Sequence, residues 1–213
     1  MENDTIKVHY FPLNGRVMVI RCMLDVAKVK YENVVHTFEE WGKMEKPSNI
    51  FEYGFLPVVE VNGKSFSQRI AITSYLGKKL GFMGTNEEEE YEVLNYLSSF
   101  DDVAPELGGA LFIQDKEAQQ KRLKELADTY LCWILPIYER KFTNRKGKYL
   151  VGDKLSAADM IIAYFFWLLR CQKDAWVPAM EKFAPTLAVW AEALLTNELK
   201  DNYNGNFVKN TFL

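Results

Sequence analysis

At 213 residues, with 48% hydrophobic and 14% aromatic residues, the chain has enough length and apolar content for two small domains and is far from the composition of disordered proteins. Its 26 basic and 29 acidic residues give a net charge of −3, without a basic cluster of the kind that binds nucleic acid. These features exclude an extended polyanion as partner and favour a folded enzyme or binding module.

The N-terminal residues MENDTIKVHYF lack a basic segment followed by an apolar one, and no apolar run approaches the roughly 18 residues of a transmembrane helix. We therefore expect a cytosolic protein with no membrane partner. Cys22, Cys132 and Cys171 are odd in number and widely spaced, so we expect buried free thiols and neither a disulfide framework nor a structural zinc site.

The first elements follow the order strand, turn, helix, strand. Residues 6–11 are typical of a short strand, residues 12–15 carry turn residues, and apolar residues then recur at helical spacing from Val17 onward. Residues 31–36 return to β-branched and aromatic side chains. This pattern predicts a βαβ unit with two parallel strands.

The next segment, LPVVEVNGKSFS at residues 56–67, predicts an antiparallel hairpin. Asn62 and Gly63 both tolerate the positive φ angles of a type I′ turn between two strands. Residues 68–80 then have helical spacing and are followed by Gly81, a common residue just past a helix end. The first 80 residues therefore predict βαβ followed by ββα.

Beyond that point the strand patterns stop and helical patterns fill the chain. Thr85 or Asn86 can cap a helix whose first turn, residues 87–90, consists of four glutamates. The helix dipole favours negative charge at this end, so we interpret the acidic run as a helix start and not as a metal site. The helical pattern continues through residues 92–112 and recurs at residues 116–142, 156–171 and 178–195, the last interrupted at Pro185. We expect one α/β domain over residues 1–82 and an all-helical domain over residues 87–213.

Three blocks, in this order, resemble the cytosolic glutathione S-transferases of the sigma-like, tyrosine-using class. They are YFPLNGR at residues 10–16, LPVVEVNGK with SQRIAITSYL at residues 56–76, and GDKLSAAD at residues 152–159. The resemblance implies a thioredoxin-like N-terminal domain that binds glutathione as co-substrate, an all-helical C-terminal domain, a homodimer and no metal.

The resemblance implies that Tyr10 donates a hydrogen bond to the glutathione thiolate. Lowering a thiol pKa from about 8.5 by two units needs about 2.7 kcal/mol, and one hydrogen bond to a charged group supplies roughly 1.5–3 kcal/mol. A neutral hydroxyl is therefore sufficient. The spacing of Tyr10 alone favours a core tyrosine at the end of a strand, and the flanking blocks reverse that preference. Arg16 is implied to orient the loop after the first strand and to support the thiolate; a structural salt bridge is the alternative.

Contacts along glutathione are implied in the same way. A cis bond between Leu56 and Pro57 would let the Leu56 backbone pair with the cysteinyl main chain, whereas a trans bond at a strand edge is the commoner state. Trp41, with Lys43 or Lys46, would reach the glycine carboxylate.

Gln68 and Arg69 begin a helix whose backbone N–H groups suit the γ-glutamyl carboxylate. The family commonly has serine at position 69 and glutamine at position 55, where this chain has Arg69 and Phe55. Arg69 can hold a carboxylate in a bidentate fork or lie solvated, and the Phe55 side chain cannot make the hydrogen bond that a glutamine there would make to glutathione. These departures leave a catalytically quiet structural or assembly subunit as the alternative to an enzyme.

The segment FDDVAPEL at residues 100–107 resembles the helix in which sigma-like enzymes place paired aspartates. Asp102 would reach across a dimer interface to the α-amino group of glutathione, a solvated carboxylate being the alternative. A small hydrophobic electrophile would bind between the domains, the usual place for such ligands. The residues expected to line that pocket are Phe11, Leu13, Leu107, Phe112 and Leu213.

The block GDKLSAAD also has a structural meaning. Ser156 and Asp159 stand at the N-cap and N3 positions of a predicted helix, a carboxylate variant of the capping box, with Leu155 placed for a hydrophobic staple. We assign this motif to folding. The predicted reaction is therefore attack of the glutathione thiolate on an electrophile, or its use in isomerising a peroxide-like substrate.

Overall fold

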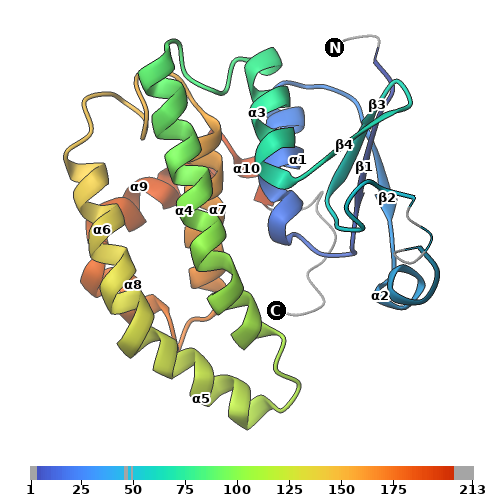
Figure 1. The fold of residues 1–213 in the computed structure, drawn as a ribbon. Coiled ribbons are helices and arrows are strands. Elements are labelled where there is room, and N and C mark those ends of the chain that lie inside the picture. The colour runs from blue at the N-terminus through green and yellow to red at the C-terminus, as the bar shows by residue number, and fades with distance from the viewer. Residues whose placement is uncertain (1–3, 46–47, 49, 204–213) are drawn as a thin grey trace. The chain divides into compact units, whose positions relative to one another are not determined.

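The structure is a computed structural model and describes residues 4–45, 48 and 50–203. The described residues form two compact units (Figure 1). The first comprises residues 4–83 together with residues 201–203, and the second comprises residues 84–200. The family-implied architecture is confirmed: a thioredoxin-like α/β unit is followed by an all-helical one.

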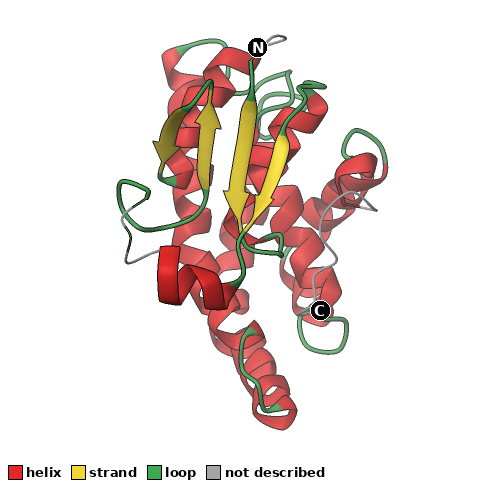
Figure 2. Ribbon diagram, turned by 90° about the vertical axis from the view of Figure 1, so that its right-hand side faces the viewer, coloured by secondary structure: helices red, strands yellow, loops and turns green. Residues whose placement is uncertain are grey.

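A four-stranded mixed sheet forms the centre of the first unit (Figure 2). Its order is β2-β1-β3-β4, with β1 parallel to β2 and antiparallel to β3, and β3 antiparallel to β4. The predicted Asn62-Gly63 turn joins β3 to β4 with φ angles of 52° and 81°. The strands are β1 (Ile6–Tyr10), β2 (Glu32–Val35), β3 (Val58–Val61) and β4 (Lys64–Ser67).

Helices α1 and α3 pack against each other and cover one face of the sheet (Figures 1 and 2). A short 3-10 turn (Gly15–Val17) leads into α1. Helix α3 ends, as expected, at Gly81, which has a left-handed φ of 81°. The helices of this unit are α1 (Met18–Val26), α2 (Phe38–Glu40), which continues as a π-helical turn (Trp41–Glu45), and α3 (Arg69–Leu80).

Helix α10 (Lys200–Tyr203) carries the chain back to the first unit. The Asn202 amide donates to the Asp25 carboxylate of α1 at 3.3 Å, and Asn202 is buried. The sequence predicts these last described residues to be part of the helical domain, whereas residues 201–203 belong to the first unit.

The second unit is built around α7, which packs against α4, α8 and α9. Asn86, and not Thr85, caps α4, because its side chain accepts from the Glu89 N–H at 2.9 Å. The expected break at Pro185 separates α8 from α9. The helices are α4 (Glu87–Leu111), α5 (Lys116–Leu126), α6 (Cys132–Thr143), α7 (Ala157–Cys171), α8 (Val177–Phe183) and α9 (Pro185–Thr196).

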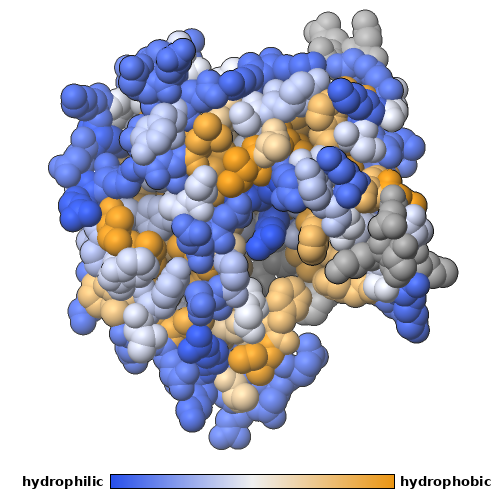
Figure 3. All heavy atoms as spheres, in the orientation of Figure 1, coloured by the Kyte–Doolittle hydropathy of each residue, from blue (hydrophilic) through white to orange (hydrophobic). Residues whose placement is uncertain are grey.

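The helix expected over residues 116–142 is interrupted by a π-helical segment (Ala127–Leu131) between α5 and α6. A π turn inserts one residue without breaking the run of helix-forming side chains, so local composition does not reveal it. Helix α5, KEAQQKRLKEL, is largely hydrophilic. It lies at the bottom of the view in Figure 1, where the surface in Figure 3 is mostly blue. Within the described residues, no helix is both long and apolar enough to cross a bilayer.

The capping motif holds the start of α7. The Asp159 side chain is fully buried and accepts from the backbone N–H groups of Leu150 at 2.8 Å and Ser156 at 2.7 Å. The Ser156 hydroxyl donates to the same carboxylate at 2.7 Å. One side chain therefore satisfies donors on both the helix and the loop that precedes it.

We expect Asp159→Ala to lower the free energy of unfolding by about 3 kcal/mol, because it leaves two buried backbone donors without an acceptor. Asp159→Asn keeps one acceptor oxygen and should lose clearly less. Urea denaturation of the two variants beside the wild-type protein measures the difference. Equal stability of the Ala and Asn variants would contradict the role given to the carboxylate.

Candidate functional site

Tyr10, the last residue of β1, is buried, with 6% of its surface exposed. Its hydroxyl accepts a hydrogen bond from the Arg16 backbone N–H at 3.1 Å. Gly15 makes this approach possible: its φ is 45°, and a Cβ at that position would lie 2.8 Å from the Tyr10 hydroxyl. A side chain at position 15 would therefore be strained and would push against the phenol.

Burial raises the pKa of Tyr10 above its ordinary value, more than the surrounding groups lower it. The opposing influences are the hydrogen bond from the Arg16 N–H and the positive charges of Arg16, Arg21 and Arg69. The phenol is consequently neutral near pH 7. Since its oxygen accepts from Arg16, its own O–H proton is not used in that bond and can be donated to an anion in the positive field of the arginines.

Arg21 supports this loop, a role that the sequence analysis did not find. It is 1% exposed, its Nε donates to Asn33 Oδ1 at 2.9 Å, and its Nη1 donates to the Leu13 carbonyl at 3.2 Å. It thereby connects the turn after β1 to β2. An arginine inside the apolar stretch MVIRCMLDV of α1 could have indicated this role. Arginine is almost never fully buried unless it is paired, so an arginine in such a stretch is expected to have polar partners.

Gln68 and Arg69 lie at the start of α3. Gln68 occupies the N-cap position without a side-chain capping hydrogen bond. Its φ of 70° costs energy for a residue with a Cβ, and such backbone strain clusters at functional sites. Arg69 is 5% exposed, so it is not the solvated arginine weighed from the sequence. The peptide bond between Leu56 and Pro57 is cis, as the resemblance implied.

Trp41 belongs to an apolar cluster with Phe51 and Val58, against which Phe11 and Leu56 pack. The structure thus brings together three residues that the sequence analysis named separately: Phe11, Trp41 and Leu56.

The remaining contacts named for this unit differ in how they are placed. The Lys43 side chain is 72% exposed and pairs with Glu39 at 2.6 Å, while Lys46 lies outside the described residues. Phe55 is 62% exposed, and Leu13 is buried.

Residues named on the helical unit are placed on α4 and just after it. Asp102 is exposed, and its backbone carbonyl accepts from the Tyr130 hydroxyl at 3.4 Å. Leu107 is fully buried, Phe112 is 45% exposed, and Leu213 lies outside the described residues. A hydrophobic pocket formed jointly with the first unit stays a prediction.

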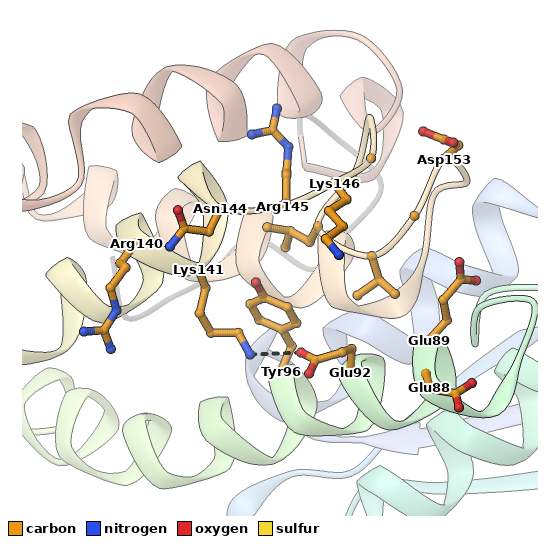
Figure 4. A pocket seen from close by; sticks show the side chains of 14 residues that line it. Glu88, Glu89, Glu92, Tyr96, Arg140, Lys141, Asn144, Arg145, Lys146 and Asp153 are labelled. Atoms are coloured by element: carbon orange, nitrogen blue, oxygen red, sulfur yellow. Dashed lines mark hydrogen bonds and ion pairs between the residues drawn. The ribbon is translucent and has the colours of Figure 1, made fainter.

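The helical unit has a cavity of about 760 Å³ between the first turns of α4, the end of α6 and the loop that follows α6 (Figure 4). Its walls are charged and partly paired. The Lys141 ammonium contacts Glu92 at 3.0 Å, and Glu89 accepts from the Thr85 N–H at 2.7 Å. Such walls do not suit an apolar ligand. Within the described residues, no group of three or more His, Cys, Asp or Glu side chains is placed to hold a metal ion.

Comparison with known proteins gives a consistent result. The family model "Glutathione S-transferase, C-terminal domain" matches residues 101–201. The class-mu 28 kDa glutathione S-transferase of Schistosoma haematobium is 34% identical over 167 residues, covering 76% of this chain and 77% of that protein.

Two solved structures have the same fold. The glutathione S-transferase of Ascaris lumbricoides superposes with a TM-score of 0.76 at 27% identity, covering 92% of this chain and 95% of its own. Prostaglandin synthase D of Nilaparvata lugens superposes with a TM-score of 0.71 at 28% identity, covering 92% of this chain and 96% of its own.

Gly15→Ala should destabilise the protein more than Gly63→Ala, a matched control at which φ is also positive but no atom lies within 4 Å of the added Cβ. The left-handed backbone alone costs roughly 1–2 kcal/mol at either position, and the clash with Tyr10 adds roughly 1–3 kcal/mol at position 15. Urea denaturation measures both, and the Arg16 amide resonance reports on its hydrogen bond to Tyr10. Equal losses, with an unshifted Arg16 amide, would show that the close approach at Gly15 is not needed.

Proposed function

Because the chain belongs to the glutathione S-transferase family, we propose that it binds glutathione on its α/β unit and conjugates glutathione, through its thiolate, to small hydrophobic electrophiles. The observation that carries this proposal is the neutral, buried Tyr10 hydroxyl, oriented by the Arg16 N–H in the field of three arginines. That environment favours an anionic acceptor over a neutral one.

The proposed reaction begins with loss of the thiol proton of bound glutathione to solvent. The Tyr10 O–H donates a hydrogen bond to the resulting thiolate, and this interaction supplies most of the roughly 2.7 kcal/mol needed to lower the thiol pKa by two units. The sulfur then attacks the electrophilic carbon, a carbon–sulfur bond forms, and the leaving group departs with its electron pair. Tyr10 stays protonated throughout and is not a base.

The other proposed contacts follow the length of the tripeptide. The Leu56 backbone, beside the cis Pro57, would pair with the cysteinyl main chain, and the start of α3 at Gln68 and Arg69 would receive the γ-glutamyl carboxylate. Trp41 would donate its indole N–H at the glycine end.

Further contacts depend on parts that the structure does not place. Lys43 or Lys46 would serve the glycine carboxylate if the Lys43 pair with Glu39 opens. In the proposed homodimer, Asp102 of the partner subunit would reach the α-amino group. The electrophile would lie beside Phe11 and the exposed Phe112.

Isomerisation is a second candidate, supported by the likeness to prostaglandin synthase D at 28% identity and nearly full length. The same thiolate would attack one peroxide oxygen and break the O–O bond, so that the other oxygen leaves as an alkoxide and takes up a proton. Loss of the proton from the carbon that bears the sulfur-bound oxygen would then form a carbonyl and release the thiolate. A cyclic peroxide substrate and a chlorinated dinitrobenzene, tested in parallel, separate the two activities. Failure to bind glutathione at millimolar concentration would contradict both and favour a quiet subunit.

Tyr10→Phe should lower kcat for thiol conjugation about tenfold to a hundredfold, the equivalent of one hydrogen bond to a charged group, with the dissociation constant of glutathione changed by less than about threefold. The pH at which the rate is half-maximal should rise toward the free thiol pKa, because the thiolate loses its donor. Steady-state kinetics between pH 5.5 and 9 and calorimetric titration measure these quantities. An unchanged kcat and pH profile would remove Tyr10 from the mechanism.

Arg69→Ala should raise the KM for glutathione about tenfold if the guanidinium holds the glutamyl carboxylate, since a charge-assisted hydrogen bond contributes roughly 1.5–3 kcal/mol. Arg69→Lys, which keeps the charge but not the bidentate fork, should fall between the Ala variant and the wild-type protein. Circular dichroism confirms that both variants fold. A KM unchanged in the folded Ala variant would limit Arg69 to its influence on Tyr10.

A further inference from the structure

The only two histidines of the chain, His9 and His36, contact each other inside the α/β unit. His9 lies on β1 and His36 directly after β2, the parallel neighbour of β1. His9 Nδ1 and His36 Nε2 are 3.0 Å apart, and the residues are 8% and 6% exposed. The local sequence around either residue gives no indication of this pair, which is 27 positions apart.

Two aromatic side chains of the apolar cluster that contains Trp41 contact the histidine pair. The ring of Trp41 meets His36 edge-on at a centroid distance of 5.6 Å, and the ring of Phe51 meets His9 at 5.0 Å. The His36 backbone N–H also donates to the Tyr10 carbonyl at 3.0 Å. The imidazole pair therefore adjoins the backbone of Tyr10 and the ring of Trp41.

The hydrogen bond between the two imidazoles exists only in some protonation states of the pair. A nitrogen–nitrogen hydrogen bond needs one N–H donor and one bare acceptor, which two neutral imidazoles or one neutral and one protonated imidazole can supply. When both rings are protonated, two N–H groups face each other at 3.0 Å and the bond is lost. The pair thus holds at most one extra proton while it stays intact.

Charged groups on three elements act on the pair. The Glu60 carboxylate on β3 lies 3.5 Å from His9 Nε2, and Lys7 on β1 acts against protonation of His9. Glu40 on α2, whose carboxylate is bound by Thr37, has a small electrostatic interaction with His36. Burial is the largest influence and lowers the pKa of His9 below its ordinary 6.5, with Glu60 opposing it. The neutral form of His9 is therefore favoured at pH 7.

We propose that His9 and His36 are positioning residues for glutathione, because their shared hydrogen bond holds Trp41 and the end of β1 in the arrangement that binds the tripeptide. This inference rests on the proposed glutathione site. Binding should be strongest where the bond is intact, and should weaken as the pH falls far enough for the second proton to break it.

The first test needs no glutathione. In long-range ¹H–¹⁵N spectra of the untagged, ¹⁵N-labelled protein, all imidazole signals come from His9 and His36, the two histidines of the chain. The Trp41→Phe variant identifies the Trp41 indole resonance. We expect one nitrogen of each ring to be shifted by the shared hydrogen bond at pH 7.5, and the Trp41 indole signal to change together with the imidazole signals as the pH is lowered. Independent histidines, or an indole signal that does not follow them, would overturn the inference.

The second test measures glutathione binding by calorimetry at pH 7.5. His9→Leu removes the hydrogen bond at similar volume and should raise the dissociation constant about fivefold to tenfold, the loss expected for one hydrogen bond. His9→Asn places an amide near the Nδ1 position and should restore affinity to within about twofold, while removing the part of the pH dependence that comes from His9.

The outcomes separate this inference from the proposed function. If the His9→Leu variant is folded by circular dichroism and has the same dissociation constant for glutathione as the wild-type protein, the inference is wrong and the proposed function is unaffected. Absence of binding in the wild-type protein would overturn the proposed function and this inference with it. If His9→Leu does not fold, the pH titration of the wild-type Trp41 indole signal still decides.

Discussion

The hydrogen bond from the Arg16 N–H to the Tyr10 hydroxyl is the contact on which the proposed site depends. It exists because the chain turns back over the end of β1 at Gly15, where only a residue without a side chain can come this close to the phenol. Arg21 stabilises the same turn, because it donates hydrogen bonds to the Leu13 carbonyl and to the Asn33 side chain on β2. The orientation of one hydroxyl is thus determined by the backbone of a whole turn.

Electrostatics gives that hydroxyl its chemical character. Removing a phenol from water penalises its anionic form, whereas three nearby guanidinium groups favour it, and burial is the larger influence. The result is a neutral donor in a positive field, which suits a thiolate better than a second neutral group. A charge buried as deeply as Arg21 is tolerated because carbonyl and amide oxygens replace part of its hydration.

The helical unit depends on a separate constraint. Asp159 fastens the loop that contains Leu150 to the first turn of α7, and α7 packs against α4, α8 and α9. A fully buried carboxylate is stable there because three donors surround it. The stability of this unit and the chemistry of Tyr10 therefore rest on different residues.

Most helices and strands, and several of their ends, can be read from the amino-acid sequence alone. The Asn62-Gly63 turn, the C-terminal Gly81 of α3, the glutamate-rich start of α4 and the break at Pro185 are all encoded within a few consecutive residues, because turns and caps are satisfied locally. The resemblance carried by three short blocks added the order of the domains and the importance of Tyr10.

Which polar groups meet depends on the tertiary structure. The charge of Arg69 near Tyr10, the hydrogen bond from Arg21 to the Leu13 carbonyl and the pairing of His9 with His36 each involve residues from different parts of the chain, so no local pattern indicates them. The π-helical segment between α5 and α6 escaped prediction for a related reason, since its side chains suit either kind of helix. Strand pairing and helix packing select these contacts, because they set the distances over which a hydrogen bond or a charge can act.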